Sequence, residues 1–340
     1  MIRKLVAQYF QLVDLSDLAL PDGPVLVRSD VQTALYERMF AETVFPLPPA
    51  NYRARVLKLI LARIEASIRD PEEDEILDDL MSCWSTLIAT PKTPALEQAQ
   101  QLELVEYTAP VQPDTTDSTP ERTVITSESR GLIYGSGTTG FRTWEAALHL
   151  GSFLVTGMGE SLIRGKRVIE LGAGTGFLSL LCARHLGAQA VVATDRETTL
   201  IENMDRCASH NQTETAAALP FYPAVWEWGT PLDVKGGGDA VSEWTNFDVA
   251  LGADLIYDAD LVPLLLSTVQ DLFDNYGVQH FIISATVRNE DTFQTFLRVC
   301  ESHAFTVEQL PFQSAPSESQ TGFFHSTSTP IRTYRILPSS

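Results

Sequence analysis

Residues Arg167–Phe177, RVIELGAGTGF, lie at the midpoint of the 340-residue chain and decide its fold. The apolar run predicts a short buried strand. Gly172, Gly174 and Gly176 predict a turn whose backbone approaches a ligand more closely than any Cβ would allow. The apolar residues after Gly176 predict a helix, whose N-terminus directs free N–H groups and the positive end of its dipole at that ligand. The stretch therefore predicts a strand–turn–helix unit that binds a nucleotide-like cofactor.

Two classes of nucleotide cofactor are bound by such a turn, and position 177 separates them. A dinucleotide-binding turn follows G-x-G-x-x-G/A, which requires Gly or Ala where this chain has Phe177. The chain instead carries E-x-G-x-G-x-G, with Glu170 closing the strand. That pattern resembles motif I of the class I S-adenosylmethionine-dependent methyltransferases. A nicotinamide dehydrogenase is the disfavoured alternative.

The charge of the chain bears on its partners. Its 24 Lys and Arg stand against 44 Asp and Glu, a formal net charge of −20 at pH 7. Phosphate binding needs a basic surface, so a nucleic-acid substrate is disfavoured. An acidic surface suits a basic protein partner, although acidity can equally serve solubility alone. No apolar run reaches the roughly 20 residues of a spanning helix, so we expect a soluble protein without a membrane segment. We also expect a monomer.

The cysteines and histidines predict no metal site. The four cysteines are scattered without a C-x-x-C pair, and the six histidines show no metal-ligand spacing. Each cysteine lies in an apolar or amphipathic helical context, which predicts buried free thiols in a reducing compartment. We therefore expect a cytoplasmic protein.

Three segments are expected along the chain: a helical N-terminal domain over 1–107, a linker over 108–122 and a methyltransferase domain over 123–340. The linker is rich in Thr and Pro and almost free of aliphatic residues. Apolar residues at helical spacing predict N-terminal helices over 31–45, 52–68, 76–89 and 96–107.

Beyond residue 123 strands alternate with helices, which predicts a parallel sheet covered on both faces. A strand or hairpin is expected at 123–134, leading into this domain. The expected strands of the sheet are 167–171, 190–195, 221–225, 247–255 and 278–286, followed by 306–311 and 331–337. The last two strands have no helix between them, so they fit an antiparallel addition at the sheet edge.

Side chains suited to a cofactor follow several of these strands. Parallel sheets bind ligands beyond the carboxyl ends of their strands, where the strand order reverses. Glu170–Gly176, Asp195, Trp226–Trp228 and Asp254 all fall at such ends. Asp195 lies about where nucleotide-binding folds place an acidic residue on the ribose hydroxyls. These strand ends together predict one cofactor site.

A more specific resemblance rests on four further segments. They are GTTGFRTWEAALHL at 137–150, VWEWG at 225–229, ADLIYD at 253–258 and SATVRNEDTFQTF at 284–296. The first three resemble, in that order, the pre-core, the Trp-Gly element and the D-x-x-Y signature of the seven-β-strand protein-lysine methyltransferases. Motif I belongs to the same resemblance. The last segment and the helical N-terminal region resemble the branch that methylates eukaryotic elongation factor 2.

The resemblance covers residues 123–337, and the N-terminal region only in size and helical character. It implies an α/β fold: a class I methyltransferase, Rossmann-like, doubly wound seven-stranded sheet with an antiparallel last strand, beside a small α-helical domain. The chain departs from the family at the KGGGD insertion at 235–239 and at a long polar loop at 313–330. Both departures fall in loops, so they leave the predicted chemistry intact. They make the surface that contacts the target protein harder to infer from the family.

The same resemblance assigns residues to the cofactor, S-adenosyl-L-methionine. The glycine loop would lie under its methionine and ribose portions, and Asp195 would take the ribose hydroxyls. Trp228 with Glu227 would flank the adenine, and Trp144 would close the pocket. The implied cofactor-binding residues are Trp144, Glu170, Gly172, Ala173, Gly174, Gly176, Asp195, Glu227, Trp228 and Ala253. Arg142 and Thr143 are weaker candidates, and Asn289 is a possible substrate contact implied by the branch alone.

Lysine chemistry directs attention to Asp254 and Tyr257. A lysine amine has a reference pKa near 10.4, so at pH 7 only about one in a few thousand is a free nucleophile. An enzyme must hold that neutral amine in line with the methyl group. Asp254 and Tyr257, at one strand end, could orient the amine and take its departing proton through water. A helix N-cap is the structural alternative for Asp254.

The sequence therefore predicts a protein-lysine N-methyltransferase acting on elongation factor 2. One alternative is the same chemistry on a chaperone, an AAA ATPase or another elongation factor. A second is a cofactor-binding scaffold without catalysis, against which the intact Asp254–Tyr257 pair argues. The N-P-P-Y/F tetrad of enzymes that methylate planar amide or adenine nitrogens is absent from 254–257.

Overall fold

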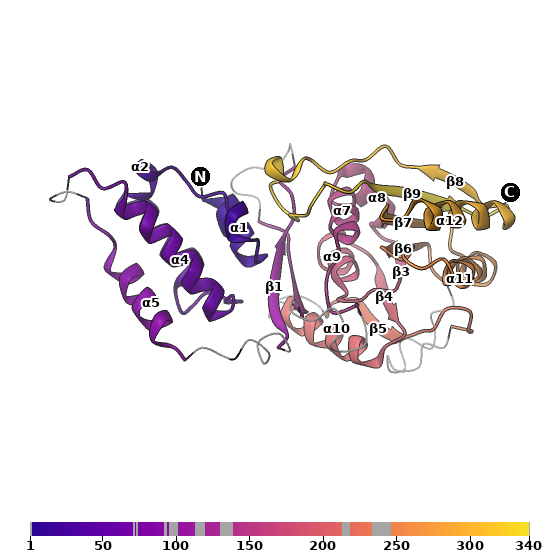
Figure 1. Ribbon diagram of the computed structural model, residues 1–340. Coiled ribbons are helices and arrows are strands. Elements are labelled where there is room, and N and C mark those ends of the chain that lie inside the picture. The colour runs from indigo at the N-terminus through magenta and orange to yellow at the C-terminus, as the bar shows by residue number, and fades with distance from the viewer. Residues whose placement is uncertain are drawn as a thin grey trace.

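The structure, a computed structural model, describes residues 2–70, 72, 74–91, 94, 101–112, 120–129, 139–212, 218–232 and 246–339. Figure 1 shows a group of N-terminal helices beside a larger α/β part, with the strand β1 standing between them. The KGGGD insertion lies outside the described residues.

The N-terminal part consists of short helices around an apolar core of its own. The longest, α4, buries Val56, Leu57, Ile60 and Ile64 at helical spacing. The helices predicted at 31–45, 52–68 and 76–89 are confirmed with shifted ends. The elements are α1 (Arg3–Phe10), the 3₁₀-helix η1 (Leu15–Asp17), α2 (Gly23–Leu26), α3 (Ser29–Leu35), the π-helix η2 (Tyr36–Phe40), α4 (Ala50–Glu65) and α5 (Asp78–Ala89).

The helix predicted at 96–107 is wrong over its last residues, which form a strand. β1 (Glu103–Thr108) pairs antiparallel with β2 (Thr123–Glu128) in a two-stranded sheet. Val105 and Tyr107 are buried while Glu106 between them is half-buried, an alternation with the period of two that belongs to a strand. β1 contacts α1, and β2 packs against two helices of the larger part, α9 (Phe177–His185) and α10 (Thr198–Asn211). The division into domains at 107 and 122 stays a prediction.

The larger part contains the seven-stranded sheet that the sequence predicts. Its strands lie in the order β5-β4-β3-β6-β7-β9-β8, parallel from β5 to β7 and antiparallel beyond. The chain runs outward from β3 to β5 and returns on the other side of β3 at β6, which makes the β3–β6 boundary the switch point. The strands are β3 (Arg167–Leu171), β4 (Ala190–Asp195), β5 (Phe221–Val225), β6 (Val249–Ala253), β7 (His280–Thr286), β8 (Thr306–Gln309) and β9 (Ile331–Leu337).

Helices cover both faces of this sheet, each over its own apolar cluster. Successive residues of β3 alternate between the faces, since Val168 packs in one cluster and Ile169 in the other. One face carries α7 (Glu145–Leu154), α8 (Gly157–Ile163), α9 (Phe177–His185) and α10 (Thr198–Asn211), and the other carries α11 (Val262–Asn275) and α12 (Glu290–Ser302). Among the described helices none is by itself long and apolar enough to cross a membrane; α7 and α8 reach that length only as a pair bent by 92°.

The last two strands form the predicted antiparallel addition at the sheet edge. Within this pair β9 lies on the inside, between β7 and β8, and β8 takes the edge position. Tyr334 and Ile336 are buried, as suits the inner position of β9. β8 has no fully buried residue, as suits an edge.

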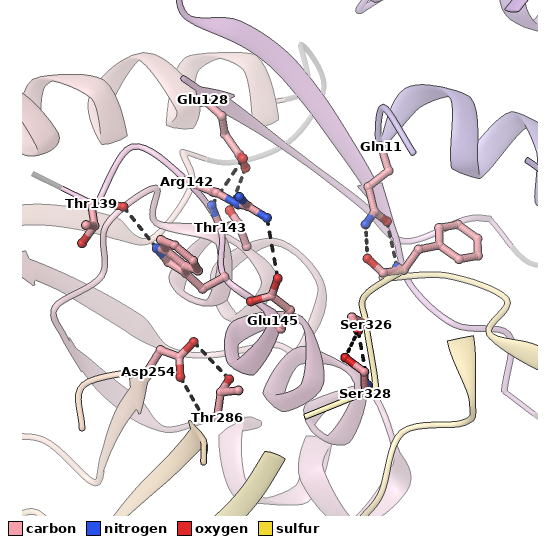
Figure 2. Close-up of polar contacts among 12 residues, drawn as sticks. Gln11, Glu128, Thr139, Arg142, Thr143, Glu145, Asp254, Thr286, Ser326 and Ser328 are labelled. Carbon is pink, nitrogen blue, oxygen red and sulfur yellow. Dashed lines mark hydrogen bonds and ion pairs between the residues drawn. The ribbon is translucent and has the colours of Figure 1, made fainter. Parts of the chain in front are cut away.

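The polar loop at 313–330 packs into the molecule at its middle. Phe323 is fully buried, with its ring 5.0 Å from that of Phe177 at the start of α9. The next residue, Phe324, exchanges two hydrogen bonds with the buried Gln11 side chain: the Phe324 N–H donates to Oε1 at 2.9 Å, and Nε2 donates to the Phe324 carbonyl. Figure 2 shows this paired contact. The loop therefore joins the N-terminal helices to the helix that follows the glycine turn.

We predict that Gln11→Ala lowers the free energy of unfolding by about 1–3 kcal/mol, because it leaves two buried backbone groups of Phe324 unsatisfied. Urea denaturation measures the change. Gln294→Ala removes the same side chain from the surface of α12, where it bonds to the exposed Glu290, and should change stability by less than about 0.5 kcal/mol. Equal effects of the two substitutions would contradict the role given to Gln11.

Candidate functional site

A cavity of about 410 Å³ opens beyond the carboxyl ends of the parallel strands, a volume typical of small-ligand sites. All sequence-predicted site residues line it except Gly176 and Asn289. These lining residues are Trp144, Glu170, Gly172, Ala173, Gly174, Asp195, Glu227, Trp228, Ala253, Asp254 and Tyr257. The weaker candidates Arg142 and Thr143 line it as well. The strands that supply these residues lie on both sides of the switch point.

The glycine turn between β3 and α9 forms the floor of the cavity. Gly172, Gly174 and Gly176 have φ angles of 59°, 54° and 77°, which L-residues with a side chain rarely adopt. A Cβ on Gly172 would come within 2.7 Å of Leu255, and one on Gly174 within 2.9 Å of the Gly140 carbonyl oxygen. Gly176 lies beneath the cavity and caps α9 in the left-handed conformation. Only this backbone keeps the turn narrow enough for a ligand to rest on it.

Two carboxylates stand beside the turn. Asp195 ends β4, and its Oδ2 accepts a hydrogen bond of 3.0 Å from the Gly174 N–H. Glu170, on β3, accepts bonds from the N–H and the hydroxyl of Ser179 in the first turn of α9. Burial raises the pKa of Glu170 to about 8, against the opposing effect of Ser179, and burial also raises the pKa of Asp195. Both groups keep lone pairs for hydroxyl or ammonium donors.

These residues fit S-adenosylmethionine. A ribose needs an acceptor for its hydroxyls, which Asp195 provides beside the glycine backbone. An adenine needs an apolar wall, and Trp228 and Leu255 supply one. The sulfonium and amino groups are cationic and suit a cavity lined by carboxylates and by the Trp144 face. When bound, the cofactor supplies an electrophilic methyl group.

Asp254 is held more firmly than a strand-end carboxylate usually is. Its φ is +55°, and its N–H donates to the Ser284 carbonyl at 2.9 Å. Oδ1 accepts from the Thr286 N–H at 2.8 Å, and Oδ2 accepts from the Thr286 hydroxyl at 3.2 Å and from Arg288 at 3.1 Å. Figure 2 shows Asp254 and Thr286 facing each other below the start of α7. Because the next helix, α11, begins only at Val262, the N-cap alternative for Asp254 is wrong.

Tyr257 and Asn289 differ in their surroundings. Tyr257 lines the cavity yet is 63% exposed, so its ring forms part of the rim. Asn289 caps α12 by accepting hydrogen bonds from the N–H groups of Asp291 and Thr292. The capping bond gives Asn289 a structural role, and its contact with substrate stays a prediction.

A cluster of charged residues around Trp144 was not foreseen as a unit. The Arg142 and Arg288 guanidinium groups lie 4.9 Å and 5.3 Å from the Trp144 ring. Glu145 pairs with both, at 3.6 Å and 3.3 Å. Sequence reasoning missed Arg288, although it follows the end of β7 in segment 284–296 and directly precedes Asn289. That position is the signal that could have found it.

A buried carboxylate, Glu128, ties β2 to the cavity. Its Oε1 accepts hydrogen bonds from the hydroxyls of Tyr107, Thr126 and Thr143 at 2.7–2.8 Å. The Thr143 hydroxyl lies 2.7 Å from that of Thr175 in the glycine turn. One hydroxyl has one proton, so Thr143 donates to Glu128 and accepts from Thr175. Thr143 therefore links the β1–β2 sheet to the turn, and a lone Glu in an otherwise uncharged strand was the available signal.

No cluster of three or more His, Cys, Asp or Glu suited to a metal occurs in the part of the chain that the structure describes. The four cysteines are free thiols, and three of them are buried.

We predict that Glu170→Gln changes the pH dependence of stability. Because the pKa of Glu170 is raised by folding, its contribution is fully present below its ordinary value of about 4.5 and is lost as pH rises through about 8. The free energy of unfolding of the variant, relative to wild type, should therefore increase between pH 5 and pH 8 and then level off. Urea denaturation across this range measures it.

Glu301→Gln is the matched control, since Glu301 is an exposed carboxylate on α12. Its difference from wild type should stay flat with pH. A difference for Glu170→Gln that is equally flat would show that Glu170 is ionised at neutral pH.

Comparison with known proteins identifies the chemistry of the cavity. Residues 133–303 match a family described as lysine methyltransferase. The protein-lysine N-methyltransferase EFM3 of Chaetomium thermophilum is 39% identical over 328 residues, which cover 95% of this chain and 94% of that protein. The protein named EEF1A lysine methyltransferase 3 of Mus musculus is 32% identical over 157 residues, 46% of this chain and 60% of that protein.

Among solved structures, the methyltransferase domain of bacterial CtHen1-C covers 58% of this chain and 100% of its own, with a TM-score of 0.41 and 17% identity. The family match spans the cofactor turn and the strand ends around the cavity, from which the methyl donor follows. The chain thus belongs to the lysine methyltransferase family: it is a protein-lysine N-methyltransferase whose methyl donor is S-adenosylmethionine.

Proposed function

We propose that the chain methylates a lysine of elongation factor 2, in the cytoplasm and as a monomer. The observation that carries the choice of substrate is the resemblance of residues 284–296, together with the helical N-terminal part, to the branch that methylates this factor. The free thiols at all four cysteine positions fit a reducing compartment. The net charge of −20 suits a protein acceptor rather than a nucleic acid.

Asp254 is the residue proposed to receive the substrate amine. Among the residues that the structure describes, Oδ1 accepts one hydrogen bond, from the Thr286 N–H at 2.8 Å, which leaves a lone pair for an N–H of the lysine. The carboxylate is fixed by its backbone turn and by Thr286, so the amine it holds is oriented and not merely attracted. In-line transfer would require that the amine held by Asp254 present its lone pair to the methyl carbon of the bound cofactor.

Tyr257 is proposed to guide the lysine side chain to Asp254. Its ring lies exposed at the rim, where its face can pack along the aliphatic part of a lysine. Burial of part of the side chain raises the pKa of Tyr257, so its hydroxyl keeps its proton at neutral pH. It therefore acts as a neutral hydrogen-bonding group and not as a base.

A second acceptor is elongation factor 1A, favoured by the name of the mouse relative. That relative matches less than half of this chain, whereas the Chaetomium protein matches 95% of it, including the N-terminal helices. Elongation factor 2 stays the acceptor proposed first, because the resemblance to its branch rests on residues 284–296 together with the helical N-terminal part.

We predict that purified elongation factor 2 gains methyl groups on one lysine when incubated with the protein and labelled S-adenosylmethionine. Asp254→Asn should lower kcat/KM by about 10²-fold, since misplacement of the amine costs this much. Asp260→Asn is the control, because Asp260 is an exposed carboxylate in the same loop. Mass spectrometry locates the lysine.

Methylation of elongation factor 1A with none on elongation factor 2 would overturn the choice of substrate. Full activity of a folded Asp254→Asn variant would instead overturn the role of Asp254 and leave the substrate in place.

A further inference from the structure

The charges around Trp144 compensate one another in pairs. Asp254 and Glu145 carry two negative charges, and Arg142 and Arg288 carry two positive ones. Arg288 is the one that reaches both carboxylates, at 3.1 Å from Asp254 and 3.3 Å from Glu145. The carboxylate proposed to receive the lysine is therefore already paired with a cation before any substrate binds.

Arg142 provides an internal comparison. It stacks on the same indole as Arg288 and pairs with the same Glu145. It makes no ion pair or hydrogen bond to Asp254, whose described partners on this side are Thr286 and Arg288. The two arginines thus share every contact of the cluster except the one with Asp254.

The pairing matters because the nucleophile must be neutral. A carboxylate without a partner stabilises a lysine ammonium and opposes loss of its proton. A cation held against that carboxylate cancels this effect while leaving the oxygen free to accept a hydrogen bond. We propose that Arg288 is a positioning residue of the transfer site, which cancels the charge of Asp254 so that this carboxylate orients the lysine as a neutral amine.

The inference rests on the proposed role of Asp254 and not on the choice of substrate protein. In the transfer, the ammonium first gives its proton to water. The freed lone pair forms the N–CH₃ bond as the S–CH₃ bond breaks, and the electron pair of that bond returns to sulfur. Arg288 takes no part in either bond.

Other charged groups face the same cavity from every element around it. They are Arg142 before α7, Glu170 on β3, Asp195 at the end of β4, Arg196 and Glu197 after it, and Glu227 after β5. Glu145 pairs with Arg142 and Arg288 beside this lining. Acidic groups outnumber basic ones in this set, so the cavity as a whole favours an ammonium. Arg288 opposes that tendency at Asp254, because it pairs with Oδ2 of the carboxylate whose Oδ1 would accept the amine.

The test compares Arg288→Gln, Arg288→Lys and Arg142→Gln by measuring kcat and KM for the acceptor protein between pH 6.5 and 9.5. In Arg288→Gln the rise of kcat with pH should move upward by about one pH unit, because a neighbouring cation no longer favours the neutral amine. At pH 7.5 its kcat should then fall about tenfold without a rise in KM. Arg288→Lys should keep the wild-type profile. Arg142 lines the cavity, so Arg142→Gln can change the size of kcat, but the pH at which kcat rises should stay that of wild type.

Calorimetry measures the affinity of each variant for S-adenosylhomocysteine. An affinity equal to that of wild type shows that the variant is folded with an intact cofactor pocket. The acceptor is elongation factor 2 or, if wild type leaves that factor unmethylated, the protein that wild type labels in a cell lysate. The latter result would overturn the substrate proposal alone.

The Asp254→Asn background separates the remaining outcomes. If Arg288 acts through Asp254, Arg288→Gln should reduce kcat no further in that background. A wild-type pH profile for Arg288→Gln, or an equal shift for Arg142→Gln, would overturn the role of Arg288. Full activity of Asp254→Asn would overturn the role of Asp254 on which it rests.

Discussion

The turn between β3 and α9 is the constraint on which the rest of the site depends. Three residues at positive φ bring the chain from a buried strand into a helix within a few residues, and the turn is closed against Gly140 on one side and Leu255 on the other. Leu255 follows β6, so the turn also fixes how the strands on the two sides of the switch point meet. A Cβ on Gly172 or Gly174 would collide with Leu255 or with the Gly140 carbonyl oxygen, respectively.

Buried carboxylates surround this turn, and each is compensated differently. Glu170 is buried and accepts hydrogen bonds from the N–H and the hydroxyl of Ser179 in the first turn of α9. Burial has a larger effect than these bonds, so the pKa of Glu170 rises. Glu128 accepts hydrogen bonds from three hydroxyls and from the Thr143 N–H. Asp254 is paired with the Arg288 guanidinium group and lines the cavity. The kind of compensation thus matches the role of each carboxylate, since the first two hold the structure together and the third is proposed to hold the nucleophile.

The N-terminal helices are connected to the site through packing and backbone contacts. Gln11 holds Phe324, and Phe323 beside it packs on Phe177, the first residue of α9. Tyr107 of β1 packs on the same Phe177 ring, at 5.1 Å, and donates to Glu128. Phe177, which in the sequence only excludes a dinucleotide, is therefore the point where three distant segments meet the helix below the cofactor turn.

The sequence by itself determined the sheet, the cofactor turn and the strand ends. These follow from local patterns: glycine spacing, apolar runs with a period of two, and acidic residues that close strands. Only the tertiary structure decided that 103–108 is a strand, that β9 lies inside the sheet, and that Arg288 pairs with Asp254. Each of these depends on a partner more than 15 residues away in the chain, such as Glu128 for Tyr107 or Asp254 for Arg288. Contacts of that kind leave no periodic trace in the sequence, because they are set by which strands become neighbours.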